Sequence, residues 1–445
     1  MKKLTLAGSI VTTVGLIVGA AIFLLLPYLA GMAGQSLWLA FVLAGIPTAL
    51  AGLYLMQMAS VVPVSGAHFI CISRFISPTV GVMTSFSALI CLISLACMVS
   101  SGLGQYVALL VPGVNPTVVA VGALVFFSGL NLLGLRFFEI LQSFMFLLLV
   151  AGILAFAFLG LGMSNDVLRE PFMPKGVGSF VIAMAIATNA WLGIVGVTEI
   201  AGSIDRPERN IPVSILISVA VVGILYFLMA YSFTGLVSWQ EAGKIGPSGV
   251  LEVAKERFPA WGTALVAIGA IMSMATTINA FVLLVVSVMN PMAATGVLSK
   301  RFKVTSPKSG MPIFSILTYT AVAIVVVIVA GGELEKYALI SVQAVMVYQI
   351  CGATSVLRMP SRAPELFSRS SYAFGAPLRW SIWTVCTLAF VAMMAFGFMA
   401  DLWLSLSYFL ILAISYGYWH ARKRVMNRRG VDLEQEIGIW VRQVS

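Results

Sequence analysis

The chain has 445 residues, of which 60% are hydrophobic and only 9% are charged, with a net charge of +10 and a mean hydropathy of +1.04. A soluble domain carries about 25% charged residues, so this composition excludes a water-soluble globular protein. The apolar runs are long and continuous, which favours spanning helices over the short alternating strands of a barrel. We therefore predict an all-α membrane protein, because only helices and closed barrels satisfy their backbone groups in lipid.

Twelve transmembrane helices are expected from these runs. The first follows Lys2 and Lys3, as the core of a signal peptide would, but it is longer than the roughly 7–15 apolar residues of such a peptide and is retained as a span. In chain order the spans cover residues 8–33, 36–62, 81–111, 116–134, 138–162, 178–203, 211–237, 261–291, 311–331, 336–357, 380–400 and 402–420.

The lysines and arginines are distributed unevenly between the connecting segments. With the N-terminus in the cytoplasm, 20 of the 26 lie in cytoplasmic segments and 6 in outer segments. This positive-inside bias predicts a plasma-membrane protein, as in a bacterial inner membrane, with both termini cytoplasmic. The net charge therefore does not indicate a nucleic-acid partner. Residues 1–420 form the expected membrane domain, and residues 421–445 a basic, then acidic tail whose basic part can contact membrane lipid.

The reactive side chains do not form a catalytic or cofactor-binding pattern. The five cysteines lack C-x-x-C spacing and are expected to pack within or beside the spans, with neither a disulfide framework nor a bound metal. His68 and His420 are the only histidines, and both fall at predicted cytoplasmic edges. We therefore expect no cofactor, and we expect that the chain is not an enzyme, since membrane-embedded catalysis needs clustered polar groups.

Glycines interrupt two spans at corresponding places, the first span of each five-span half. These segments are GLIVGAAIF at residues 15–23 and NAWLGIVGVTE at residues 189–199. Paired interruptions of this kind provide exposed backbone groups at mid-membrane depth in solute-binding membrane proteins. Close helix packing through small residues is the alternative interpretation. The pattern predicts that the chain unwinds near Gly19 and Gly193.

Two further sets of polar residues are candidates for ion binding. Glu199 is a carboxylate within a span, where a charge costs about 2.5–3.5 kcal/mol, so it is a candidate proton site; alternatively it reaches cytoplasmic water. Ser273, Thr276 and Thr277 share one helix face and could offer oxygens to Na⁺, or bond back to their own helix. Trp191 could stack over a solute or simply pack.

Five motifs resemble those of the amino acid–polyamine–organocation superfamily, in the same order along residues 5–420. Besides the first glycine-rich segment at 15–23, they are the proline–glycine loop PVSGAHF at 63–69, DRPERNIP at 205–212, GVLSKRF at 296–302 and RAPELFSRSSYAFGAP at 362–377. The chain is identified on these motifs as a member of that superfamily.

The resemblance implies the leucine-transporter-like fold, with inverted five-helix repeats at about 8–162 and 178–357, discontinuous helices 1 and 6, and two extra helices at 380–420. It also implies a secondary transporter that works by alternating access. The solute's carboxylate would meet the backbone of Val18, Gly19, Ala20 and Ala21. Its opposite side would be lined by Asn189, Trp191, Gly193 and Gly196.

Three departures from the family pattern affect the expected substrate and coupling ion. No serine follows Gly19, no acid follows Gly193 by two positions, and the fifth span lacks a lysine near Leu149. We expect an amino acid or a similar small molecule, preferably neutral, moved by symport with H⁺ through Glu199 or with Na⁺ through the span-8 oxygens. The alternatives are an exchanger of amino acids or amines and a nutrient sensor that does not transport. The protein could be a monomer or a homodimer.

Overall fold

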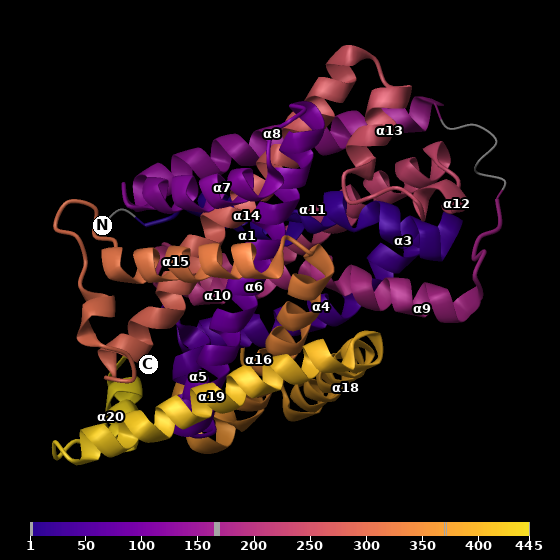
Figure 1. Ribbon diagram of the computed structural model, residues 1–445. Helices are drawn as coiled ribbons and strands as arrows, with labels where there is room; N and C mark the ends of the chain where they lie inside the picture. Colours follow the sequence, from indigo (N-terminus) through magenta and orange to yellow (C-terminus); the bar gives the residue numbers. More distant parts are fainter. Residues whose placement is uncertain (1–2, 164–169, 369, 371, 445) are drawn as a thin grey trace.

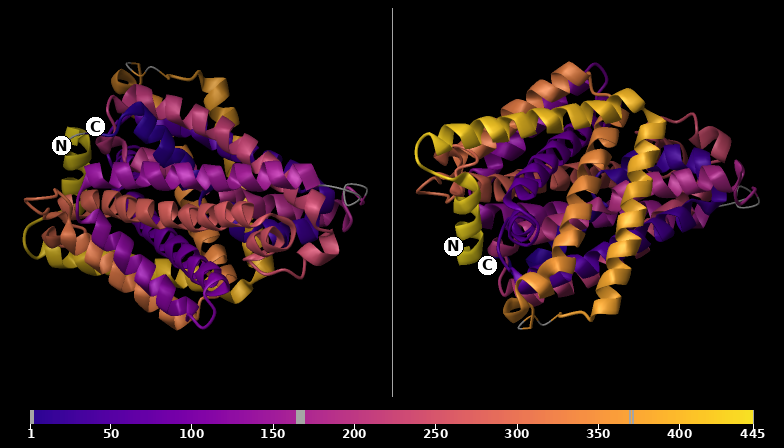
Figure 2. Two further views of the ribbon diagram at one scale, coloured as in Figure 1. Left: turned by 90° about the horizontal axis from the view of Figure 1, so that it is seen from above. Right: turned by 90° about the horizontal axis from the view of Figure 1, so that it is seen from below.

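The computed structural model describes residues 3–163, 170–368, 370 and 372–444. Within these residues the chain is helical apart from turns and one isolated bridge between Leu4 and Ile204. Several of the long helices run side by side, and others cross them at steep angles (Figures 1 and 2). Lys2, Arg169 and Arg369, which the charge analysis assigns to connecting segments, lie outside the described residues.

Eleven helical stretches in the described part of the chain are long and apolar enough to cross a membrane, which makes this an integral multi-pass membrane protein. The predicted span at 116–134 corresponds to α7 (Pro116–Asn131), which is only 16 residues long and is not one of the eleven. The helices that form these stretches are α1 (Leu6–Val18), α2 (Ala21–Leu24), α3 (Leu26–Ala33), α4 (Leu37–Val61), α6 (Pro78–Leu110), α8 (Leu135–Met163), α9 (Gly176–Ala187), α11 (Pro207–Leu236), α14 (Ala260–Ala294), α15 (Ile313–Ala330), α16 (Leu334–Arg362), α18 (Ala376–Ala400) and α19 (Leu402–Asn427).

Local signals explain where several of these helices begin. The side chains of Ser77, Asn115 and Asp401 accept hydrogen bonds from the first turns of α6, α7 and α19. Each is a favoured N-cap residue, and Pro78 directly follows the first of them, at the position where a missing amide proton costs least.

The inner helices form two crossed pairs and two central contacts. α6 packs on α16, α8 packs on α14, and the centre holds α6 against α14 and α4 against α11. At the crossing of α8 and α14, a Cβ added to Gly152 would lie 2.5 Å from the Cα of Gly269, so only glycines permit this approach. The last two long helices, α18 and α19, lie along the outside of the bundle (Figure 2).

Both chain ends lie at the same end of the bundle (Figures 1 and 2). The short helices α5 (Ala67–Phe75) and α20 (Leu433–Val444) pack on each other there, while α12 (Trp239–Ala242) and α13 (Gly249–Arg257) cover the opposite end. Glu434 of α20 pairs with Lys423 at 3.0 Å and accepts a hydrogen bond from Thr79 at 2.9 Å. These two bonds hold the pKa of Glu434 below its usual value.

Candidate functional site

The first helix is interrupted at Gly19, inside the glycine-rich segment singled out in the sequence. α1 ends at Val18 and α2 begins at Ala21. Between them Gly19 has φ +35° and ψ −162°, a conformation that only glycine adopts without strain. The hydroxyl of Ser273 on α14 donates a hydrogen bond to the freed Gly19 carbonyl. The break therefore exposes backbone in the middle of the bundle, as predicted.

The second segment differs from the prediction, because it changes helical pitch without unwinding. α9 gives way to a 3₁₀ helix, η3 (Thr188–Val195), followed by the short α10 (Gly196–Glu199). A 3₁₀ helix keeps i→i+3 backbone bonds, so fewer groups are freed than in an open break. A Cβ added to Gly193 would lie 2.0 Å from the Leu16 carbonyl oxygen. Glycine is needed here because the two segments touch, which was the alternative interpretation.

A tyrosine that the sequence analysis overlooked holds the two segments together. The hydroxyl of Tyr226 on α11 lies 2.8 Å from the carbonyl oxygens of both Ile17 and Ala190, and 3.4 Å from that of Val18. A hydroxyl has one proton to donate, so these carbonyls share it. Since carbonyls of both segments lie within reach of one side chain, Tyr226 links the two discontinuous helices.

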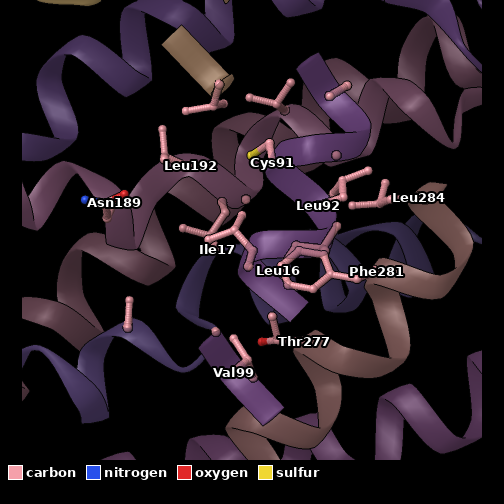
Figure 3. A pocket seen from close by; sticks show the side chains of 18 of the residues that line it. Leu16, Ile17, Cys91, Leu92, Val99, Asn189, Leu192, Thr277, Phe281 and Leu284 are labelled. Carbon is pink, nitrogen blue, oxygen red and sulfur yellow. The ribbon is translucent and has the colours of Figure 1, made fainter. Parts of the chain in front are cut away.

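A pocket lies against these two segments and contains about 790 Å³ of space not filled by atoms (Figure 3). Its wall consists of the α1–α2 break, η3 with α10, and faces of α6, α14 and α16. Most of the lining is apolar, including Leu92 on α6 and Phe281 and Leu284 on α14. The predicted site residues that line it are Gly19, Ala20, Ala21, Asn189, Gly193, Gly196, Glu199 and Thr277.

Four predicted site residues are not part of this lining: Val18, Trp191, Ser273 and Thr276. The Trp191 indole is buried behind the wall, where Nε1 donates to the Phe41 carbonyl at 3.1 Å and the ring packs edge-on against Tyr226. It therefore packs in the bundle and does not stack over the pocket. A buried polar atom that does face this region is Oδ1 of Asn189, which lacks a hydrogen-bond partner among the described residues.

The predicted oxygen face on α14 is only partly directed at the break. The hydroxyls of Thr276 and Thr277 donate to the Ser273 carbonyl at 2.8 and 2.9 Å, which is the bonding to their own helix considered as an alternative. Ser273 instead reaches Gly19, and Thr277 is the member of the set that lines the pocket. The hydroxyl oxygens keep lone pairs that can accept a further partner.

Glu199 is buried and bonded, so the alternative that it simply reaches water is wrong. It is 4% exposed, and its Oε1 lies 2.5 Å from the hydroxyl of Tyr348 and 2.5 Å from Nδ1 of His68. The backbone amide of His68 also points to this oxygen at 3.4 Å. His68, which was predicted to lie at a cytoplasmic edge, belongs to α5 and is fully buried. The sequence feature that could have identified His68 as a site residue is its position within the 63–69 loop motif.

The sequence is similar to those of several known proteins. The sequence model described as amino acid permease matches residues 8–428. The methylthioribose transporter of Bacillus subtilis is 23% identical over 67% of this chain and 68% of its own length. The branched-chain amino acid permease BcaP of the same organism is 27% identical over 67% of this chain and 68% of its own.

Two further similar proteins come from other organisms. The vacuolar cationic amino acid transporter 8 of Arabidopsis thaliana is 24% identical over 70% of this chain and 55% of its own length. An uncharacterized protein of Methanocaldococcus jannaschii is 26% identical over 63% of this chain and 66% of its own length. The chain thus spans about two thirds or less of these relatives. The family model covers nearly the whole chain, and the chain therefore belongs to the amino acid permease family, within the superfamily that its motifs resemble.

Proposed function

We propose that this protein is a secondary active transporter that carries an amino acid or a similar solute across the membrane by alternating access. The observation that supports this most directly is the pocket between the Gly19 break and the 3₁₀ segment, within a bundle of spanning helices. A site bounded by discontinuous helices is typical of secondary transporters. The relatives are named as transporters and permeases, which favours transport over enzymatic chemistry.

The arrangement of the helices supports a five-plus-five inverted repeat with α7 as a twelfth, short span. If α6 corresponds to α14 and α8 to α16, the contact of α6 with α16 is the counterpart of the contact of α14 with α8. α4 and α11, which would be equivalent, pack on each other, as do α6 and α14. Such reciprocal contacts are what a pseudo-two-fold axis produces. This arrangement puts both termini on one side, which we assign to the cytoplasm of a plasma membrane.

The substrate that fits this pocket has a free carboxylate and amine and an apolar side chain. The backbone of Gly19, Ala20 and Ala21 would meet the carboxylate, because α2 starts there and a helix N-terminus attracts negative charge. Asn189 offers an unpartnered amide oxygen to the amine. The apolar wall would receive the side chain, and the branched-chain permease among the relatives agrees with this choice.

For the coupling ion we favour H⁺ bound near Glu199, with Na⁺ at Ser273, Thr276 and Thr277 as the second candidate. The buried carboxylate supports the first, because it lines the pocket and lies among hydrogen-bond donors. The test is leucine uptake into proteoliposomes under an imposed H⁺ or Na⁺ gradient. Equal uptake with neither gradient, but with leucine inside, would identify an exchanger. Leucine-induced thermal stabilisation without any uptake would identify a sensor.

Replacing the carboxylate provides a second test. In Glu199→Gln the side chain keeps its size, and its amide oxygen can still accept from Tyr348. We expect folded protein whose uptake no longer depends on pH. An unchanged pH profile would remove Glu199 from the coupling path and direct attention to the oxygens of α14.

A further inference from the structure

The buried cluster around Glu199 contains a second titratable group that the motifs do not explain. His68 lies at the start of α5, Glu199 ends α10, and Tyr348 is on α16. The imidazole and the Tyr348 ring are stacked, with centroids 4.2 Å apart and planes 24° from parallel. The backbone amide of Gly66 also donates to the Glu199 carbonyl at 3.0 Å. Helices α5, α10 and α16 therefore meet at the pair formed by His68 and Glu199, beside the pocket.

The hydrogen bonds around Oε1 of Glu199 suit an ionised carboxylate beside a histidine protonated on Nδ1. Oε1 of Glu199 accepts from the Tyr348 hydroxyl at 2.5 Å. A second short contact, also 2.5 Å, comes from Nδ1 of His68. An ionised carboxylate only accepts, so Nδ1 carries a proton and donates it. In the neutral imidazole the lone pair then resides on Nε2.

Nε2 of His68 is the vacant proton-binding atom of this cluster. It is buried and has no hydrogen-bond partner among the described residues. It faces Gly352, one helical turn after Tyr348, where an added Cβ would lie 3.1 Å away. A glycine at this position thus leaves room for the ring, and the adjacent Glu199 carboxylate would stabilise an imidazolium by charge.

The other titratable and charged groups around this couple come from three elements. Tyr54 on α4 turns its ring edge toward the imidazole, with centroids 6.4 Å apart. Cys91 on α6 lines the same pocket as Tyr348. Cys71 and Arg74 lie further along α5, and Arg74 is the formally charged member of this set. None is bonded to Nε2 within the described part of the chain.

We propose that the coupling proton binds to Nε2 of His68 and that Glu199 positions and stabilises it. The Nε2 lone pair takes a proton from water and forms an N–H bond, converting a neutral imidazole beside a carboxylate into an imidazolium–carboxylate pair. Release returns the same proton to water, and Nδ1 keeps its own proton throughout. The couple is thereby switched between a net charge of about −1 and zero. This inference rests on the proposed proton-coupled transport and names His68 as the carrier in place of Glu199.

Nuclear magnetic resonance on ¹⁵N-histidine-labelled full-length protein in lipid nanodiscs tests the proton site without any substrate. The chain has only two histidines, so His420→Gln leaves His68 as the single signal. We expect an Nδ1–H tautomer at high pH and protonation of Nε2 on acidification. A persistent Nε2–H tautomer, or an imidazole that stays neutral down to the lowest pH at which the protein remains folded, would overturn the proposal.

Leucine accumulation under a proton gradient tests the role of this site in coupling. One coupled proton at a pH difference of one unit corresponds to about tenfold accumulation, which we expect for the wild type and for His420→Gln. In His68→Gln, whose amide can still donate to Glu199, we expect no accumulation above equilibrium but continued downhill leucine entry. Gradient-driven accumulation by His68→Gln would refute the inference and leave transport intact. If Nε2 is protonated on acidification but leucine uptake does not depend on the proton gradient, proton coupling itself is refuted.

Discussion

The contact between the two discontinuous helices can be disrupted with a single methyl group. A Cβ at Gly193 would lie 2.0 Å from the Leu16 carbonyl oxygen and 2.6 Å from the Ile17 amide nitrogen. Ordinary contact begins at 3.4 Å, so η3 and α1 must separate by about 1.4 Å in Gly193→Ala. Backbone cannot rotate away as a flexible side chain can. Overpacking of this kind costs about 1–3 kcal/mol.

The expected consequence is a lower melting temperature and impaired uptake. With an unfolding entropy of about 2.1 cal/mol/K per residue, that cost lowers the melting temperature by roughly 1–3 °C. The separation also displaces both walls of the pocket, so leucine uptake should fall even in protein that remains folded. Thermal unfolding in detergent and uptake into proteoliposomes measure the two effects.

Gly178→Ala is the matched control for this substitution, because it lies on the preceding helix, α9, and its Cβ would meet nothing within 4 Å. Alanine there should be neutral or stabilise the helix by up to about 1 kcal/mol. Wild-type melting and uptake in Gly193→Ala would refute the close approach and with it the geometry of the pocket.

Two other perturbations follow from the structure. Ser273→Ala removes the donor to the Gly19 carbonyl and should lower the free energy of unfolding by about 1–3 kcal/mol. Thr276→Ala loses only a bond within its own helix and should lower it less. Equal melting temperatures of the two variants would contradict this expectation. Because the pKa of Glu434 is lowered in the folded protein, its contribution to docking of α20 is present above the unfolded value of 4.5 and is lost as pH falls further. The side chains of Lys423 and Glu434 are partly exposed to solvent, so the loss should stay below about 1 kcal/mol. Hydrogen exchange in α20 measures this loss: its rate should rise only below pH 4.5, and this rise should be absent in Lys423→Ala.

Membrane architecture could be predicted from the sequence because it depends on properties that neighbouring residues share. The low charge content and the length of the apolar runs indicate spanning helices, whatever the packing of those helices against one another. Gly19 could also be predicted, since a glycine in a span removes the steric barrier to a positive φ, and the structure uses that freedom at this residue.

Other features depend on which segments meet in space. Gly193 has the same sequence signal as Gly19, yet it serves a close contact with Leu16, which no local pattern reveals. Trp191 could as well have faced the pocket; the carbonyl of Phe41, some 150 residues away in sequence, holds it behind the wall.

The sequence by itself determined the solvent in which this protein folds, the family to which its motifs belong, and the place of the first break, because each depends on composition or on local backbone freedom. Only the tertiary structure decided the partners of Glu199. His68 is 131 residues away along the chain and Tyr348 149, and both reach the same carboxylate oxygen. Hydrogen bonds between such distant residues depend on the packing of whole helices, and the charge state of a buried site depends on those bonds.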